Sequence, residues 1–150
     1  MLGEGGADFS PLQSLFGLVR AHGGSETLAW TVQGAGAVAL AVFLIWLWPS
    51  RAPFDLKAAA LAAGALLATP YLYIYDLAAL SVAVAFLLRY ALRRGFTAAD
   101  IAGLVFAGAP ILSYPFPTTQ VGLATTLIVL ALVLQRVLSE RTYPSFRIAA

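Results

Sequence analysis

The sequence of 150 residues contains no cysteine and a single histidine, His22. Disulfides, thiol catalysis and cysteine-ligated metals are therefore excluded, and one histidine cannot form the histidine pair of a common metal site. We expect neither a metal nor a cofactor. Charge is scarce as well, because only 11% of the residues are charged, against about 25% in a typical soluble domain. This composition excludes a disordered chain and a nucleic-acid-binding domain, and it disfavours a water-soluble globule.

Long uncharged segments take the place of the missing charges. Residues 27–50 and 101–135 carry no charge, and residues 58–88 carry only that of Asp76. A membrane-spanning helix needs about 20 apolar residues. Segments of this length cannot all be buried in one small soluble core, whereas lipid accepts them once their backbone is helical. We therefore predict an all-α, polytopic integral membrane protein with about five transmembrane helices and a short amphipathic helix before them.

Proline and capping residues divide the predicted bundle, residues 25–138, into its spans. Pro70 ends the second span, because proline removes a helical hydrogen bond and disfavours helix in the residue before it. Asp55 and Thr97 are predicted to cap the second and fourth spans. As one helix, residues 101–135 would be about 52 Å long against a hydrocarbon thickness of about 30 Å, so they must fold back, and we place the turn at residues 113–120. The predicted spans lie near residues 28–48, 57–69, 76–92, 99–112 and 121–138.

Small residues and tryptophans support these spans. Ala60, Gly64 and Ala68 are four residues apart, which predicts a stripe for close helix packing. Trp30 and Trp48 lie near opposite ends of the first span, as aromatic belts at the two membrane surfaces require.

Residues 1–9 are predicted to be a flexible lead. Residues 10–24 are predicted to form an amphipathic helix that lies on the outward-facing surface of the cell membrane. Ser10 would cap this helix, with Pro11 at its first position. The residues predicted to share its apolar face are Leu12, Leu15, Phe16 and Val19. The residues predicted to point elsewhere are Gln13, Ser14 and Arg20.

The basic residues predict the orientation. Eight of the nine fall on one side of the five-span arrangement: Arg51, Lys57, Arg89, Arg93, Arg94, Arg136, Arg141 and Arg147. Only Arg20 falls on the other side. Because cytoplasmic loops carry the excess of lysine and arginine, we expect the C-terminal tail, residues 139–150, in the cytoplasm. The N-terminal segment and residues 70–76 then lie outside the cell membrane.

The outward segment holds the candidate site. Tyr71, Tyr73 and Tyr75 precede Asp76, an acid in an otherwise uncharged run, which is costly inside hydrocarbon. Two interpretations stay open: the tyrosines belong to an interfacial belt while Asp76 caps the third span, or Asp76 also binds a sugar hydroxyl beside aromatic faces. Arg20 is likewise either a surface charge or a contact to a lipid-linked phosphate.

Two stretches carry a resemblance to a known family. The segment from Leu66 to Leu77, LLATPYLYIYDL, resembles a TPY…YDL stretch in the C-terminal part of glycosyltransferase family 87. The segment from Ser14 to Arg20, SLFGLVR, resembles the SxFGxxR segment found upstream of it in bacterial members. These are polytopic membrane enzymes of the GT-C type, and the resemblance covers most of residues 10–138.

The resemblance implies transfer of a hexosyl, often mannosyl, group from a polyprenyl-phosphate-linked donor to an acceptor at the outer face. A carboxylate takes the proton of the acceptor hydroxyl, the oxygen attacks the anomeric carbon, and polyprenyl phosphate leaves. Tyr71, Tyr75 and Asp76 match the outward motif and are implied as pocket residues. Family members are considerably longer, and their catalytic acid lies further upstream. We therefore expect the C-terminal portion of such an enzyme and assign no catalytic residue.

The alternative is a small non-catalytic membrane protein with a packing or assembly role, or a transporter fragment. It predicts that Asp76 serves only as a cap or pairs with a cation, whereas the enzyme predicts Asp76 at an outward cavity beside Tyr71 or Tyr75. A transporter is disfavoured, because no internal repeat is evident and the polar break lies near one membrane face.

Overall fold

The computed structural model describes residues 12–108 and 120–142, and within these ranges the ordered elements are all helices. They are α1 (Leu15–Ala21), α2 (Glu26–Leu47), α3 (Phe54–Ala68), the 3₁₀ helix η1 (Ile74–Ala79), α4 (Leu80–Arg94), α5 (Ala98–Ala107) and α7 (Val121–Thr142). The predicted all-α class is confirmed for this part of the chain. The predicted lead, residues 1–9, and most of the predicted turn at 113–120 lie outside the described residues.

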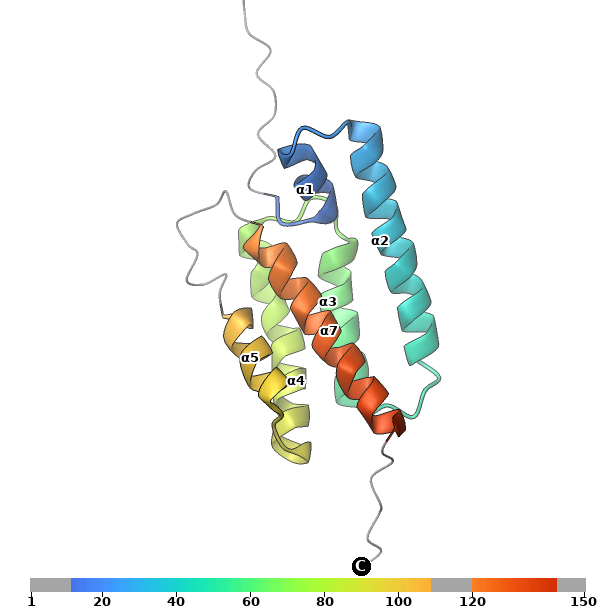
Figure 1. The fold of residues 1–150 in the computed structure, drawn as a ribbon, viewed down its shortest axis with the longest axis vertical. Coiled ribbons are helices and arrows are strands. Elements are labelled where there is room, and N and C mark those ends of the chain that lie inside the picture. The colour runs from blue at the N-terminus through green and yellow to red at the C-terminus, as the bar shows by residue number, and fades with distance from the viewer. Residues whose placement is uncertain (1–11, 109–119, 143–150) are drawn as a thin grey trace, which may run out of the picture.

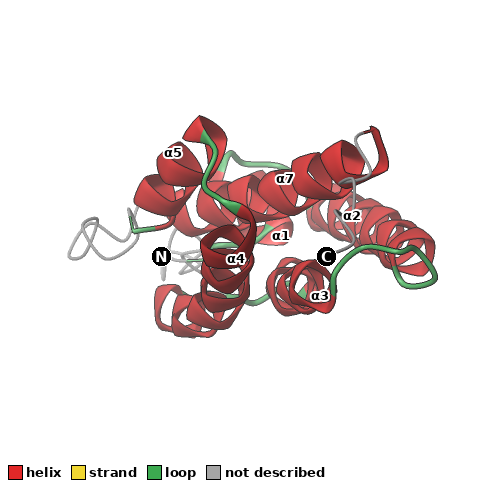
Figure 2. Cartoon of the chain, turned by 90° about the horizontal axis from the view of Figure 1, so that it is seen from below, coloured by secondary structure: helices red, strands yellow, loops and turns green. Residues whose placement is uncertain are grey.

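The long helices run up and down in a bundle (Figure 1). Viewed along the bundle, α4, α3 and α2 lie side by side, and α5 and α7 lie against them as a second layer (Figure 2). The short α1 sits at one end of the bundle, next to the start of α2. Helix α3 is central, because it packs against α2, α4 and α7.

Three segments are long and apolar enough to cross a membrane: Glu26–Leu47, Tyr75–Arg94 and Val121–Glu140. They coincide with the first, third and fifth predicted spans, so the chain has the helices of a membrane protein. The second and fourth predicted spans are also helices, but α3 has 15 residues and α5 has 10. Both are shorter than the roughly 20 residues that a straight crossing needs.

Small residues on α3 allow the close packing. Ala59, Ala60 and Ala63 are fully buried, and Gly64 faces Leu40 of α2 so closely that a Cβ there would lie 2.8 Å from Leu40 Cδ1. The predicted small-residue stripe is therefore a packing surface at Ala60 and Gly64, although Ala68 is exposed. Lipid supplies no hydrophobic drive between helices, so such close backbone approach is what holds them together.

The helix boundaries predicted at Pro70 and Thr97 agree with the structure, and the one predicted at Asp55 does not. Helix α3 ends at Ala68, directly before Thr69 and Pro70, and Thr97 caps α5 with Asp100 three residues on. The prediction for Asp55 was wrong, because the N-cap of α3 is Pro53 and makes no side-chain bond. Asp55 instead lies buried in the first turn and pairs with arginines of α4.

The predicted amphipathic helix, residues 10–24, was too long at its start. Helix α1 begins at Leu15 and its N-cap is Ser14, not Ser10. Gln13 and Ser14 were expected to point away from the apolar face, but both are buried, each 1% exposed. They are buried because a backbone hydrogen bond holds this non-helical segment against the bundle: the Gln13 N–H donates to the Leu72 carbonyl at 2.7 Å.

We predict that Gly64→Leu lowers the free energy of unfolding by about 1–3 kcal/mol, because the added side chain collides with Leu40. Thermal unfolding in detergent micelles would measure the loss. Gly34→Leu on α2 is the matched control, since a Cβ there meets nothing within 4 Å. Adding Leu40→Ala to Gly64→Leu should recover part of the stability. Equal losses for both glycine variants would contradict this packing.

Candidate functional site

The two ends of the bundle differ in chemistry. One end, here called the aromatic end, consists of α1, the start of α2 and residues 69–76, and it carries the rings of Phe16, Trp30, Tyr71, Tyr73 and Tyr75. The opposite end, here called the basic end, consists of the α2–α3 and α4–α5 connections and the last turns of α7 (Figure 1). The basic side chains described there are Arg51, Lys57, Arg89, Arg93, Arg94 and Arg136.

The two stretches that carry the family resemblance meet at the aromatic end. The Ser14 hydroxyl accepts from the Gly17 N–H at 3.0 Å as the N-cap of α1, and it donates to the Pro70 carbonyl. The Phe16 ring lies 5.4 Å from the ring of Tyr71, edge to face. Segments about fifty residues apart in the sequence therefore form one surface.

Trp30 of α2 completes an aromatic cluster with these two rings. Its centroid lies 5.0 Å from that of Phe16 and 6.1 Å from that of Tyr71. Phe16 is fully buried, whereas Trp30 and Tyr71 are 43% and 50% exposed. Tilted and edge-to-face pairs of this kind stabilise one another beyond their burial. The cluster thus has a fixed base and two ring faces open to the surroundings.

Tyr73 and Tyr75 form a second aromatic pair. Their rings are nearly parallel, at 5°, with centroids 5.4 Å apart, and Tyr75 is 69% exposed. The Asp76 carboxylate fixes this turn, because its Oδ2 accepts from the Tyr73 backbone N–H at 3.0 Å. Asp76 thus accepts a backbone N–H at the start of the third span, as expected, but the N-cap is Tyr73 and Asp76 is the third residue of η1, so the predicted cap position was three residues too late. The cap engages one of two carboxylate oxygens, and the side chain is half-buried.

Arg20 lies in the last turn of α1. Its guanidinium donates to the Gly24 carbonyl at 2.9 Å and closes the turn between α1 and α2. The structure thus joins Tyr71 to Phe16 and Trp30, and joins Asp76 and Tyr75 to Tyr73, while Arg20 serves its own turn.

Sequence reasoning missed the amides that hold this end together. Gln33 of α2 is 3% exposed; its Oε1 accepts from the Phe16 N–H at 3.1 Å, and its Nε2 donates to the Leu67 and Ala68 carbonyls at 3.0 and 3.1 Å. The Gln13 Oε1 accepts from the Gly122 N–H of α7 at 2.9 Å. Gln33 carried a usable signal, because it is an amide within an uncharged span.

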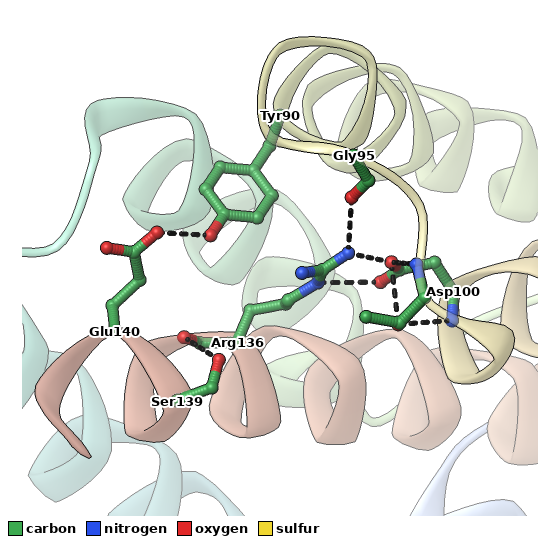
Figure 3. Close-up of polar contacts among 7 residues, drawn as sticks. Tyr90, Gly95, Asp100, Arg136, Ser139 and Glu140 are labelled. Atoms are coloured by element: carbon green, nitrogen blue, oxygen red, sulfur yellow. Dashed lines mark hydrogen bonds and ion pairs between the residues drawn. The ribbon is translucent and has the colours of Figure 1, made fainter. Parts of the chain in front are cut away.

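The basic end holds a polar network of its own (Figure 3). Arg136 of α7 binds both carboxylate oxygens of Asp100 and donates to the Gly95 carbonyl at 2.9 Å. Next to it, the Tyr90 hydroxyl donates to Glu140 at 2.6 Å.

An apolar groove of about 380 Å³ runs along the side of the bundle between α2, α3 and α7. Its lining is formed by Leu15, Gly36, Ala39, Leu40, Phe43, Leu67, Leu127, Leu130, Ala131 and Leu134. Leu15 belongs to α1, so the groove reaches up to the aromatic end. Such a groove accepts hydrocarbon and offers no group that could hold a polar ligand. Within the described residues, no three histidine, aspartate or glutamate side chains are grouped to hold a metal ion.

No family model, no curated protein and no solved structure matches this chain.

We predict that Gln33→Leu destabilises the protein by about 1–3 kcal/mol, because it strands the Phe16 N–H and two carbonyls of α3 in apolar surroundings. Amide hydrogen exchange in α1 should become faster, since α1 loses its bond to α2. The matched control is Gln135→Leu on α7, an exposed glutamine. Unchanged exchange in α1 would show that Gln33 does not anchor this helix.

Proposed function

We propose that this chain is the membrane-embedded C-terminal portion of a glycosyltransferase that uses a polyprenyl-phosphate-linked hexose, often mannose, as its donor. The observation that carries the proposal is the contact between the two resembling segments, Ser14 to Pro70 and Phe16 to Tyr71. If the two segments form one site, they must be in contact. If they resemble the family only because apolar helices are alike, no such contact is expected.

The chemistry of the aromatic end fits part of a lipid-linked sugar. Exposed faces of Trp30, Tyr71 and Tyr75 suit the C–H faces of a sugar ring, and the second oxygen of Asp76 suits a sugar hydroxyl. The apolar groove that ends at Leu15 suits the polyprenyl chain. In this proposal the chain binds and orients substrate, while the carboxylate that takes the acceptor proton is supplied from outside it. The proposal includes five crossings, with α3 and α5 as short or tilted ones.

A non-catalytic role in packing or assembly is the second candidate. It is favoured by the observation that the motif residues already serve the fold: Ser14 and Asp76 act as caps, and Arg20 closes a turn. The two candidates differ in whether the charge of Asp76 is needed once its cap is kept.

Asp76→Asn separates them, because asparagine keeps an oxygen for the Tyr73 N–H and removes only the charge. In the full-length protein we expect sugar transfer from a polyprenyl-phosphate donor to fall about tenfold to hundredfold, as for loss of a hydrogen bond to a charged group. Glu26→Gln, which removes an exposed acid from the first turn of the neighbouring α2, is the matched control and should leave transfer unchanged. Full activity of Asp76→Asn would leave Asp76 as a cap alone and favour the second candidate.

We further propose that the basic end faces the cytoplasm and the aromatic end the outside of the cell membrane, since the excess of arginine and lysine marks the cytoplasmic side. The chain has no native cysteine, so single-cysteine variants report cleanly. An impermeant maleimide should label Tyr75→Cys on intact cells and Arg51→Cys only after permeabilisation. The reverse pattern would invert the topology, and labelling of both positions on intact cells would refute this arrangement.

A further inference from the structure

The basic end presents a surface that the proposed function does not use. Val82, Phe86, Arg89 and Arg93 of α4 lie four, three and four residues apart, so they follow one face of the helix. Phe54 at the start of α3 packs edge to face on Phe86, with ring centroids 6.2 Å apart, and is 66% exposed. The surface formed by these five residues is apolar along the helix and ends in two guanidinium groups. It is called here the Arg89–Arg93 surface.

A buried carboxylate lies between the two guanidinium groups. Asp55 Oδ1 lies 3.5 Å from Arg89 Nε, and Asp55 Oδ2 lies 3.6 Å from Arg93 Nη1. The Asp55 side chain is 9% exposed, whereas those of Arg89 and Arg93 are 52% and 62% exposed. A guanidinium has five N–H donors, so these long contacts occupy a minority of them. Two positive charges and one negative charge leave the group with one net positive charge.

We propose that the Arg89–Arg93 surface binds an anionic phospholipid, with its phosphate on the two guanidinium groups and an acyl chain along Phe54, Phe86 and Val82. A phosphodiester carries one negative charge, which the net positive charge of the Asp55–Arg89–Arg93 group attracts. Arginine is suited to phosphate, because its fork of donors makes paired hydrogen bonds. The apolar part lies on the bundle side of the guanidinium groups, as the order of headgroup and acyl chain in a bilayer requires. This inference is independent of sugar transfer.

The test compares phosphatidylglycerol with phosphatidylcholine on the full chain, by native mass spectrometry of bound lipid and by thermal unfolding in nanodiscs of each lipid. We expect the protein to retain phosphatidylglycerol selectively and to unfold at a higher temperature in it. Arg89→Gln with Arg93→Gln should weaken phosphatidylglycerol binding about 30-fold, since each juxtamembrane arginine contributes on the order of a fivefold gain for anionic lipid. Arg51→Gln, an exposed arginine in the α2–α3 connection, is the control and should keep the selectivity.

Removing both arginines leaves the Asp55 charge buried without its partners, so the double variant could lose lipid binding simply by misfolding. Adding Asp55→Asn to the double variant removes that stranded charge and should give a folded protein that still lacks lipid selectivity. Asp55→Asn alone should bind phosphatidylglycerol at least as tightly as the native chain, because two positive charges then remain. Weaker binding by Asp55→Asn, retained selectivity in the triple variant, or full displacement of the lipid by excess inorganic phosphate would each overturn the proposal. Preferential binding of a polyprenyl phosphate over phosphatidylglycerol would also overturn it.

Discussion

Close approach of helix backbones at α3 is the constraint on which the rest of this structure depends. Lipid tails are as apolar as leucine side chains, so burial of leucine cannot by itself hold helices together in a membrane. The buried alanines 59, 60 and 63 and Gly64 bring α2, α4 and α7 to one central helix. That arrangement places the end of α3 next to α1 (Figure 1), and its first turn, through Asp55, next to Arg89 and Arg93 of α4.

Polar groups at both ends of α3 find partners within the protein. At its last turn, Gln33 takes up the Leu67 and Ala68 carbonyls, and at its first turn, Asp55 is held between Arg89 and Arg93. An unsatisfied backbone or charged group in hydrocarbon is costly. Satisfying the polar groups at the two ends of α3 therefore also orders the polar side chains at each end of the bundle. Both proposals concern ligands that these side chains could bind.

Much of the fold could be predicted from the sequence, and less of the candidate site. Pro70 and Thr97 marked helix boundaries correctly, because their effects are local to the backbone. Asp55 was misassigned as a cap, since local spacing does not show that two arginines more than thirty residues away share its charge. Gln13 and Ser14 were misassigned to the polar face, because helical periodicity was applied to residues that are not helical. Tyr71 was predicted as a candidate site residue from the sequence, whereas the two rings that contact it, Phe16 and Trp30, were not.

The sequence by itself determined that the described chain is helical and that three of its helices have the length and composition to cross a membrane, because uncharged runs and helix breakers act within a few residues. It also determined which residues could collect at each end, through the order of basic and aromatic residues along alternating helices. Only the tertiary structure decided which of them touch. The contacts of Ser14 with Pro70, Gln33 with Leu67 and Arg136 with Asp100 join segments 34 to 56 residues apart, and such pairings depend on how helices pack around the small residues of α3.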